Sequence, residues 1–416
     1  MAASMKQYRF FLQLLLAVLL IFLFFTAAFN YLVDPYGLFD TKRIEGFNAT
    51  KPAAGTHVRL SKPYQVINFS PKAIIAGNSR PEMGLNPANA CWPKELHPVF
   101  NLGLRGADIY MQARMLQHAI AKNDVRLVLW GLDFLDFLSM QSNTGNSWHW
   151  PPQRKTYEDR LKVNADGSDY RGYSVKKLQD HLYTLFSLDT VIDSLKTLLT
   201  QGNPHSATVR RDGFDPALNY INIIEWEGQN VLFKQKNHEV STRLSRPGLK
   251  LLQGEGRRSI AFESVRRLLQ FAQKHGVIVV LFINPYHVDY LASLDQAGLW
   301  PEFELWKSHL TILADEFSVK LWDFSGINSF STEQVPAPGD KTTILKWFWE
   351  PAHYRREYGD LMLSRMLQRP CDAGNVSPVG SLLKIKNIDT HTMRLRKDMM
   401  SYKEEHGSDL DNFRVR

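Results

Sequence analysis

The pattern of apolar and polar positions divides the chain into one long apolar segment and a longer region of alternating patterns. Residues 10–29 are apolar except for Gln13 and Thr26, and a helix of about 20 such residues spans a bilayer. Further along, five apolar runs of strand length alternate with stretches whose apolar residues recur at helical spacing. This alternation predicts an α/β fold in which a parallel sheet has helices on both faces.

The strands and helices of this fold can be placed along the chain. We expect strands at 72–76, 97–104, 125–130, 277–283 and 319–324, and helices at 107–122, 259–275, 301–317 and 356–367. Residues 134–256 interrupt the alternation, and only their segments 174–186 and 190–199 have clear helical patterns. We interpret 134–256 as a mainly helical insertion that lies over the carboxyl edge of the sheet and shapes a substrate groove.

Charges around the apolar segment predict its orientation in a membrane. Lys6 and Arg9 precede the segment and Asp34 follows it, so the positive-inside rule places residues 1–33 as a cytoplasmic N-terminus and transmembrane signal-anchor. A cleaved signal peptide is the alternative, but its apolar region is normally shorter and ends in an A-x-A site. We expect 34–69 to be a juxtamembrane linker and 70–370 to be the exported domain.

The remaining composition narrows the function further. Of the formal net charge of +8, several positive charges lie in residues 371–416, which we expect to be a solvated, partly disordered basic tail; contact with anionic lipid or an acidic polymer is the alternative. An exported domain without a recognised binding motif is not expected to bind nucleic acid. The two cysteines, Cys91 and Cys371, form either one disulfide or two buried thiols. No CxxC pair or zinc-type His/Cys cluster is present, so we expect no metal and no cofactor.

Two short motifs carry the candidate chemistry. Gly77-Asn78-Ser79-Arg80 follows the first strand, which places a serine hydroxyl at the carboxyl edge of the sheet, where open α/β sheets bind ligands. Glu350-Pro351-Ala352-His353 precedes the last helix and supplies a candidate base with an acid three residues away. The alternatives are a turn serine and a helix-capping histidine.

Other polar residues are predicted at the same edge. Gly103 follows the second strand and Asp133 the third, and Asn284 and His287 follow the fourth. Asn284 and His287 are candidates for substrate contact or for a simple turn. Arg80 is a candidate partner for an acidic substrate or for a structural carboxylate. Within the insertion, Trp148, His149 and Trp150 are either a sugar-stacking platform or buried aromatic packing.

These blocks, in this order, resemble the SGNH (GDSL-type) hydrolase superfamily. The serine block of that family reads here Gly77-Asn78-Ser79, and its glycine block matches Asn101-Leu102-Gly103, with Gly106 as a second candidate. Its third block matches Gly131-Leu132-Asp133, and its closing Asp-x-x-His block matches Glu350-Pro351-Ala352-His353. An apolar anchor followed by such a domain looks like the membrane-anchored bacterial branch, which includes proteins of alginate acetylation and of D-alanyl transfer to teichoic acids.

The resemblance implies a three-layer, flavodoxin-like sheet of about five strands and a serine esterase mechanism. Ser79 is the implied nucleophile, His353 the base and Glu350 its orienting acid, while the N–H groups of Ser79 and Gly103 stabilise the oxyanion. The chain departs from the family at Asp133, where the family has an asparagine that donates to the oxyanion. Either Asp133 is protonated, or Asn78 or Asn143 donates in its place, or the oxyanion is weakly stabilised. The structural interpretation of Asp133 is that it accepts backbone N–H groups in the loop after its strand.

Two functions follow from this interpretation. The first is an esterase or O-acyltransferase that acts on a cell-envelope polysaccharide from the periplasmic side of the inner membrane, with a membrane-bound protein as a possible acyl donor. The second is a non-catalytic relative that binds glycan or serves as a scaffold in a polysaccharide export complex. Geometry distinguishes them, because an enzyme needs Ser79 Oγ within hydrogen-bond reach of His353 and Glu350 on the other ring nitrogen.

Overall fold

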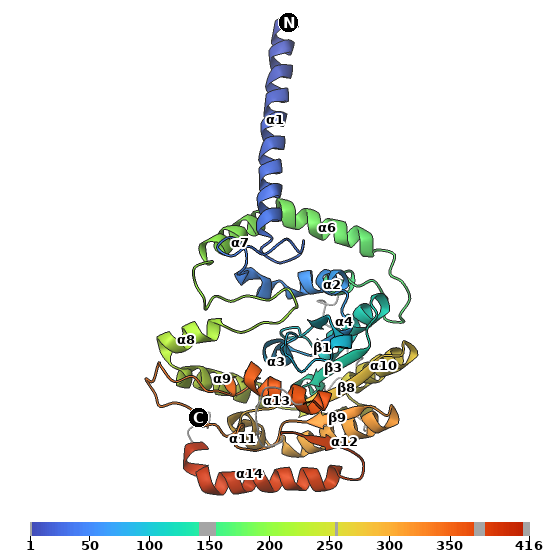
Figure 1. Cartoon of the computed structure of the whole chain (residues 1–416), viewed down its shortest axis with the longest axis vertical. Coiled ribbons are helices and arrows are strands. Elements are labelled where there is room, and N and C mark those ends of the chain that lie inside the picture. The colour runs from blue at the N-terminus through green and yellow to red at the C-terminus, as the bar shows by residue number, and fades with distance from the viewer. Residues whose placement is uncertain (1, 141–154, 254–256, 370–378, 411–416) are drawn as a thin grey trace.

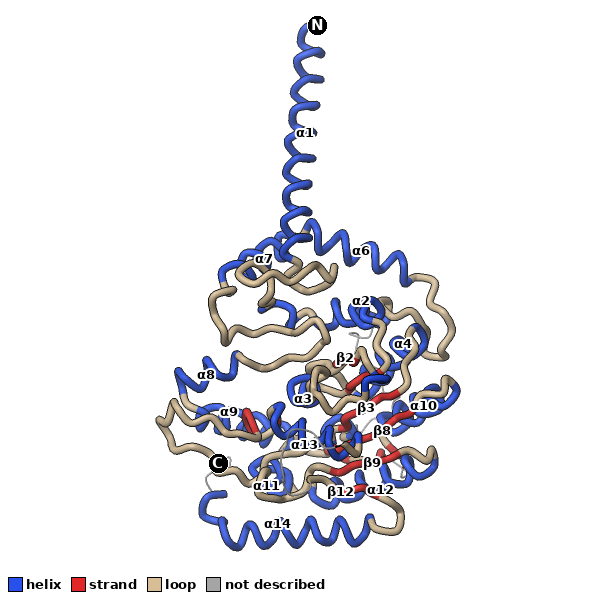
Figure 2. Tube along the Cα trace, in the orientation of Figure 1, coloured by secondary structure: helices blue, strands red, loops and turns tan. Residues whose placement is uncertain are grey.

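A single long helix projects from an α/β body in the computed structural model, which describes residues 2–140, 155–253, 257–369 and 379–410. The helix α1 (Ala2–Val33) stands at one end of the molecule, and the sheet lies well away from it (Figures 1 and 2). Its segment Met5–Val33 is long and apolar enough to cross a membrane. The apolar run at 10–29 therefore forms the helix that the sequence predicts.

The centre of the body is a six-stranded sheet in the order β12-β9-β8-β3-β1-β2. Five strands are parallel and correspond to the five expected runs: β1 (Ala73–Ala76), β2 (Val99–Asn101), β3 (Leu127–Leu132), β8 (Ile278–Ile283) and β9 (Lys320–Asp323). The sixth, β12 (Ser381–Leu383), pairs antiparallel with β9. Because β1 lies between β2 and β3, the chain leaves it first toward one side of the sheet and later toward the other.

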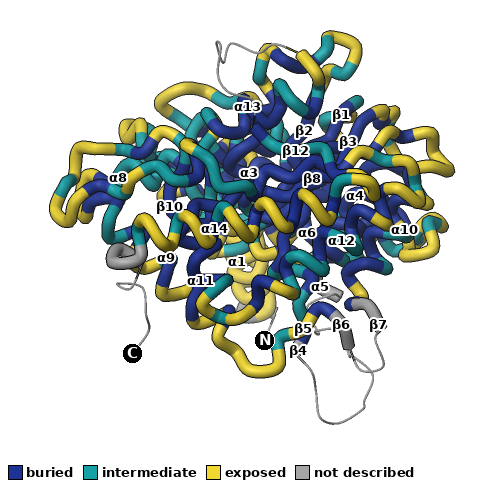
Figure 3. The backbone as a smooth tube through the Cα atoms, turned by 90° about the horizontal axis from the view of Figure 1, so that it is seen from below, coloured by how far each residue is buried: buried dark blue, intermediate teal, exposed yellow. Residues whose placement is uncertain are grey.

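Helices cover both faces of the sheet, so the strands are buried along nearly their whole length (Figure 3). Ile74, Val128 and Leu281 belong to the core on one face and Ile75 and Phe282 to the core on the other, as the alternation of side chains along a strand requires. The covering helices are α4 (Ile109–Lys122), α10 (Ile260–Lys274) and α12 (Trp300–Glu316) on the first face and α13 (Arg356–Leu367) on the second.

Capping residues explain where two of these helices begin. The side chain of Asp108 accepts the Met111 N–H at 2.8 Å at the start of α4. The hydroxyl of Ser259 accepts the Ala261 N–H at 3.3 Å at the start of α10. Each cap satisfies an N–H group that has no acceptor within its helix. All four predicted helices are found within about two residues of their expected bounds.

Residues 34–69, which the sequence predicts to be a juxtamembrane linker, are folded onto the body. They form a short 3₁₀ helix, η1 (Pro52–Thr56), and the helix α2 (Val58–Phe69), which packs on the body beside α4. Tyr36 and Tyr64 are buried. The sequence did not predict this structure because the apolar residues of 34–69 are spaced too irregularly to show a helical or strand period.

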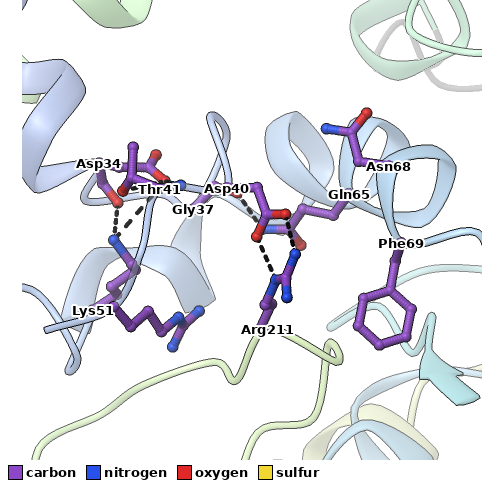
Figure 4. A pocket seen from close by; sticks show the side chains of 10 residues that line it. Asp34, Gly37, Asp40, Thr41, Lys51, Gln65, Asn68, Phe69 and Arg211 are labelled. Carbon is purple, nitrogen blue, oxygen red and sulfur yellow. Dashed lines mark hydrogen bonds and ion pairs between the residues drawn. The ribbon is translucent and has the colours of Figure 1, made fainter. Parts of the chain in front are cut away.

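A polar network attaches the end of α1 to this segment (Figure 4). The carboxylate of Asp34 accepts the Leu38 N–H at 2.8 Å, and the buried Lys51 ammonium donates to the carbonyl of Val33 at 2.9 Å. Asp40 and Arg211 form a paired contact at 2.7 and 2.6 Å. The helix α1 is therefore joined to the body by fixed contacts rather than by a flexible tether.

The insertion is mainly helical, as predicted, but its two halves lie in different places. It contains α5 (Lys155–Glu158), α6 (Tyr173–Phe186), α7 (Leu188–Leu199), α8 (Asn219–Glu227) and α9 (Gln229–Leu244). Small ladders join β4 (Ser139–Met140) to β5 (Leu249–Lys250) and β6 (Leu252–Gln253) to β7 (Arg257–Arg258). The helices α6 and α7 pack at the foot of α1, whereas α9 packs beside the strand β10 (Phe348–Glu350) and the helix α11 (Val288–Gln296) (Figure 1).

Residues 379–410 are part of the fold, which corrects the prediction of a solvated tail for this part of the chain. The helix α14 (Ile388–Leu410) packs on α12 and α11, and Leu395 and Met399 enter the main core. His391 Nε2 lies 2.7 Å from Asp323 Oδ2, which also accepts from Lys307 at 2.7 Å. Burial acts to raise the pKa of Asp323, but these two neighbours outweigh it and hold the pKa below its usual range. The many basic residues of α14 obscured its apolar face in the sequence.

We expect two neighbouring methionines of α14 to differ strongly on truncation. Met399 is 2 % exposed and Met400 is 58 % exposed. Met399→Ala should destabilise the full-length protein by about 2–5 kcal/mol because it leaves a cavity, whereas Met400→Ala should change stability by less than about 0.5 kcal/mol. Urea denaturation in detergent measures both. Equal, small effects would mean that α14 is not docked in solution.

Candidate active site

The serine of the first motif lies at a sharp turn between β1 and the short helix α3 (Ser79–Gly84). Gly77 has a φ of +143°, and a Cβ there would lie 2.4 Å from Pro81 Cγ and 2.9 Å from the Gly131 carbonyl oxygen. Only glycine fits such a position. Asn78 caps the helix by accepting the Arg80 N–H at 3.0 Å. Ser79 is thus the first residue of α3 and is partly exposed.

The acid and the histidine of the second motif come from a hairpin that faces this serine. The strands β10 and β11 (His353–Tyr354) pair antiparallel with a bulge between them. His353 Nε2 lies 2.7 Å from Ser79 Oγ, and His353 Nδ1 is hydrogen-bonded to Glu350 Oε1. The second oxygen of Glu350 accepts the Ala352 N–H at 2.7 Å. The structure therefore brings Ser79 together with Glu350 and His353, which lie more than 270 positions later in the sequence.

The electrostatics of this group define the roles of its members. Burial acts to raise the pKa of Glu350, but its interaction with His353 and the hydrogen bond from the Ala352 N–H outweigh burial and hold the pKa below its usual value. An ionised Glu350 only accepts hydrogen bonds, so His353 Nδ1 carries the proton and Nε2 is left to accept from the Ser79 hydroxyl. This is the arrangement of a nucleophile, a general base and an orienting acid.

Arg80 is buried behind the serine rather than exposed to substrate. It is 7 % exposed; its Nη1 pairs with Asp133 and its Nε donates to the Ala352 carbonyl at 2.6 Å. The guanidinium also lies 5.1 Å from the ring centroid of Tyr286 and 5.3 Å from that of Tyr290. The structure thus favours the structural alternative for Arg80, because its side chain is buried and its Nε and Nη1 donate within the protein.

Asp133 likewise has its carboxylate occupied. It is 1 % exposed, pairs with Arg80, and accepts the Leu135 N–H at 3.2 Å at the start of the 3₁₀ helix η3 (Phe134–Phe137). A carboxylate that accepts from a guanidinium is ionised and has no proton to donate. Asp133 is therefore placed as a structural acceptor and not as an oxyanion donor.

The structure also places Gly103 differently from the sequence-based expectation. The Gly103 N–H donates to Asn101 Oδ1 at 2.9 Å, so it is not available to an oxyanion. A Cβ at Gly103 would lie 2.8 Å from backbone and side-chain atoms of Glu82 in α3, so its role is close packing. The N–H of Ser79 remains the candidate donor, because the first N–H groups of a helix have no acceptor within it.

The asparagines predicted at the site are engaged as well. Asn78 Nδ2 donates to Asp136 at 3.3 Å. Asn284 is fully buried, donates to the Leu132 carbonyl at 3.1 Å and accepts from Tyr354 at 3.4 Å, so substrate does not reach it. His287 is also buried, with Nε2 placed 2.9 Å from the Glu333 carbonyl. Asn143, Trp148, His149 and Trp150 lie outside the described residues.

Asp136 is a residue near the site that sequence reasoning missed. Burial raises the pKa of its carboxyl to about 6, while the nearby Arg80 charge and hydrogen bonds from Asn78 and Gln112, both at 3.3 Å, limit the rise. The available signal was its position, three residues after Asp133 at the end of β3. It supports Asn78, which in turn caps the helix that carries Ser79.

The second half of the insertion supports the hairpin that carries the histidine. Gln229, at the start of α9, donates to the carbonyls of Phe348 and Trp349 at 2.9 and 3.0 Å. The ring of Tyr220 stacks on Trp349 with centroids 5.5 Å apart. These contacts agree in part with the predicted insertion over the sheet edge, because α8 and α9 border the site while α6 and α7 do not contact it.

Two further predictions concern bound groups and cysteines. Within the described ranges, no group of three or more His, Cys, Asp or Glu side chains is placed to hold a metal ion. Cys91 is disulfide-bonded, and the only other cysteine of the chain, Cys371, lies outside the described residues. Neither models of known protein families nor curated protein sequences match this chain, so its function is inferred from the geometry of the site.

We expect Asp133→Asn to destabilise the protein without raising any esterase activity. The change leaves the buried charge of Arg80 without its counter-ion, which costs about 3–5 kcal/mol. Urea denaturation and ester hydrolysis, measured on the same preparation, test both parts. The double variant Arg80→Met/Asp133→Asn is the control, and its loss should be smaller than the sum of the single losses. A variant of unchanged stability and higher activity would show that residue 133 faces the oxyanion.

We expect Asp136 to make stability fall as pH rises from about 4 to about 6. In this range the folded protein holds a proton on Asp136, whose pKa is raised from 3.8 to about 6, and the unfolded chain does not. Asp136→Asn removes this titration. The free energy of unfolding of the variant, relative to that of the wild type, should therefore rise by about 1–3 kcal/mol as pH increases from about 4 to about 8. The exposed Asp124→Asn is the matched control. If Asp136→Asn changed the stability equally at about pH 4 and at about pH 8, the raised pKa would be contradicted.

Proposed function

We propose that the protein is a serine esterase or O-acyltransferase that is anchored in a membrane and acts on a cell-envelope polysaccharide. The observation that carries the proposal is the continuous set of hydrogen bonds from Ser79 through His353 to Glu350. Ser79 and His353 are the partly exposed members, whereas Glu350 is buried. Substrate therefore meets the nucleophile and the base, while the acid is shielded from water.

The geometry supports acyl transfer in two steps. In the first, Ser79 Oγ attacks the ester carbonyl, its proton passes to His353 Nε2, and the Ser79 N–H donates to the oxyanion; His353 then protonates the departing alcohol. In the second, His353 takes a proton from water or from a sugar hydroxyl, which attacks the acyl-serine, and returns that proton to Ser79. Water gives hydrolysis, and a sugar hydroxyl gives O-acylation. Glu350 stabilises the imidazolium in both steps.

The arrangement of the fold supports the resemblance to the SGNH superfamily. The parallel strands have the order 2-1-3-4-5, which is that of flavodoxin-like sheets, and the serine follows the strand at which the order reverses. The Glu-x-x-His block directly precedes the last helix of the predicted domain, α13. The proposed polysaccharide substrate and the proposed membrane-bound acyl donor rest on this resemblance to the anchored branch.

Two observations support an anchored domain on the periplasmic side of an inner membrane. The helix α1 is long and apolar enough to span a bilayer, and Lys6 and Arg9 precede its apolar run. Cys91 is disulfide-bonded, and disulfides persist mainly in oxidising compartments.

We expect Ser79→Ala and His353→Ala each to lower hydrolysis of an activated acetyl ester by about 10³-fold or more in the full-length protein. The double variant should lose about as much hydrolysis activity as either single variant, because the two residues act as a unit. Mass spectrometry of the wild type should find the acetyl group on Ser79. Added oligosaccharide should speed its release if the enzyme is a transferase.

Matched controls separate catalysis from general damage. Ser70 and His275 are exposed residues away from the site, so Ser70→Ala and His275→Ala should keep full activity. All four variants should unfold at nearly the urea concentration of the wild type. Full hydrolysis by Ser79→Ala, or an acetyl group found on another residue, would exclude Ser79 as the nucleophile and favour a non-catalytic role.

A further inference from the structure

The helix α7 has its polar side toward the protein and its apolar side outward. Its fully buried residues carry hydroxyl groups at spacings of four and three: Thr190, Ser194 and Thr197. Its exposed side contains aliphatic residues at spacings of four, three and four, Leu188, Ile192, Leu195 and Leu199, together with Asp189 and Lys196. Leu199 is 85 % exposed. A surface helix of a water-soluble domain has the opposite arrangement.

The preceding helix α6 has the same inverted polarity. Asp180 and Thr184 are buried, and the Asp180 carboxylate accepts from Tyr64 at 2.7 Å and from Arg160 at 2.6 Å. The outward side contains large apolar residues at helical spacing: Val175, Leu178, Leu182 and Phe186. The buried polar groups of α6 are thus satisfied within the protein, and both helices present large apolar residues outward. Patches of this kind on a folded protein mark an interface with another protein or with a membrane.

Contacts with α1 indicate whether another protein or a membrane covers the apolar sides of α6 and α7. Asn30, near the end of α1, is fully buried; it donates to the carbonyl of Leu185 in α6 at 3.0 Å and accepts from Ser194 in α7 at 3.0 Å. Tyr36, just after α1, donates to Asp193 in α7 at 3.0 Å. Both helices are therefore fixed to the foot of α1, and Figure 1 shows them lying across its axis.

The length of α1 sets the depth of the two helices. At about 1.5 Å per residue, the apolar run 10–29 covers about 30 Å, which is the thickness of the hydrocarbon core. Asn30 is the next residue and is the one bonded to both α6 and α7. The two helices therefore lie at the level where α1 leaves the hydrocarbon, which is the depth of interfacial amphipathic helices.

We propose that α6 and α7 form a docking face for the lipid bilayer that α1 spans, with their aliphatic residues inserted at its surface. This inference rests on the proposal that α1 is a retained anchor. A lone anchor leaves a domain free to tilt, whereas two surface helices fixed at its foot hold the domain in one orientation. Along the axis of α1, the helix α3 with Ser79 then lies beyond α2, on the side away from the bilayer (Figure 1).

Photo-cross-linking of the full-length protein in lipid nanodiscs tests the docking face. A photoreactive amino acid replaces Leu178 in one variant and Ile192 in another, and Met393, an exposed residue of α14, is the matched control. Nanodiscs of phosphatidylethanolamine and phosphatidylglycerol should give lipid adducts at Leu178 and Ile192 at least about 10-fold above those at Met393. Because all three positions are exposed, each variant should fold, and either of the first two suffices.

Two results would overturn the docking face. One is a yield of lipid adducts at Leu178 and Ile192 no higher than at Met393. The other is cross-linking of these positions to a second protein in native membranes, with no adduct to lipid. The intact mass of the purified protein shows whether α1 is retained. Repeating the experiment in the Ser79→Ala background separates this inference from catalysis, because the lipid adducts should persist there while ester hydrolysis is lost.

Discussion

The candidate site depends on the buried guanidinium of Arg80. From the helix that begins with Ser79, it reaches both Asp133 at the end of β3 and the carbonyl of Ala352 in the turn before His353. The planar group offers several donors in fixed directions, so one side chain sets the separation of three segments. A buried charge of this kind adds little net stability, but removing either partner leaves the other without a counter-ion. The distance from Ser79 to His353 is thus coupled to a contact that substrate does not reach.

Buried ion pairs also join other elements of the body. Lys62 pairs with Glu82 in the helix α3 at 2.8 Å, and Lys307 pairs with Asp323 at 2.7 Å; all four side chains are fully buried. The first pair fixes α2 against α3, which begins with Ser79. In the second pair, Asp323 also contacts His391 of α14. Buried charges need close partners, so these pairs allow few alternative positions for the segments that carry them. A site that needs hydrogen-bond distances benefits from such a rigid frame.

Parts of the predicted oxyanion site have structural roles instead. The Gly103 N–H is bonded to Asn101, and Asp133 is paired with Arg80. Of these three groups, the Ser79 N–H is the one placed to donate. Loss of one oxyanion donor typically lowers the rate by about 10²–10³. An enzyme with this site would work on a reactive acyl donor or depend on groups that substrate brings. Transfer from a thioester or another activated donor fits that requirement better than hydrolysis of a stable ester.

The sequence determined those features that depend on local pattern. The apolar runs and helical periods located α1, the five parallel strands and the helix 356–367, because burial imposes a period on each element. Gly-x-Ser after a strand and Glu-x-x-His before the helix 356–367 also located Ser79, His353 and Glu350. Whether Asp133 is paired, and whether the Gly103 N–H is free, depended on Arg80 and Asn101 and so on packing in three dimensions. The periods at 174–186 and 190–199 showed that each helix has two unlike sides. Only the tertiary structure decided that the polar sides face the protein, because the neighbours of a helix, and not its period, determine which side is buried.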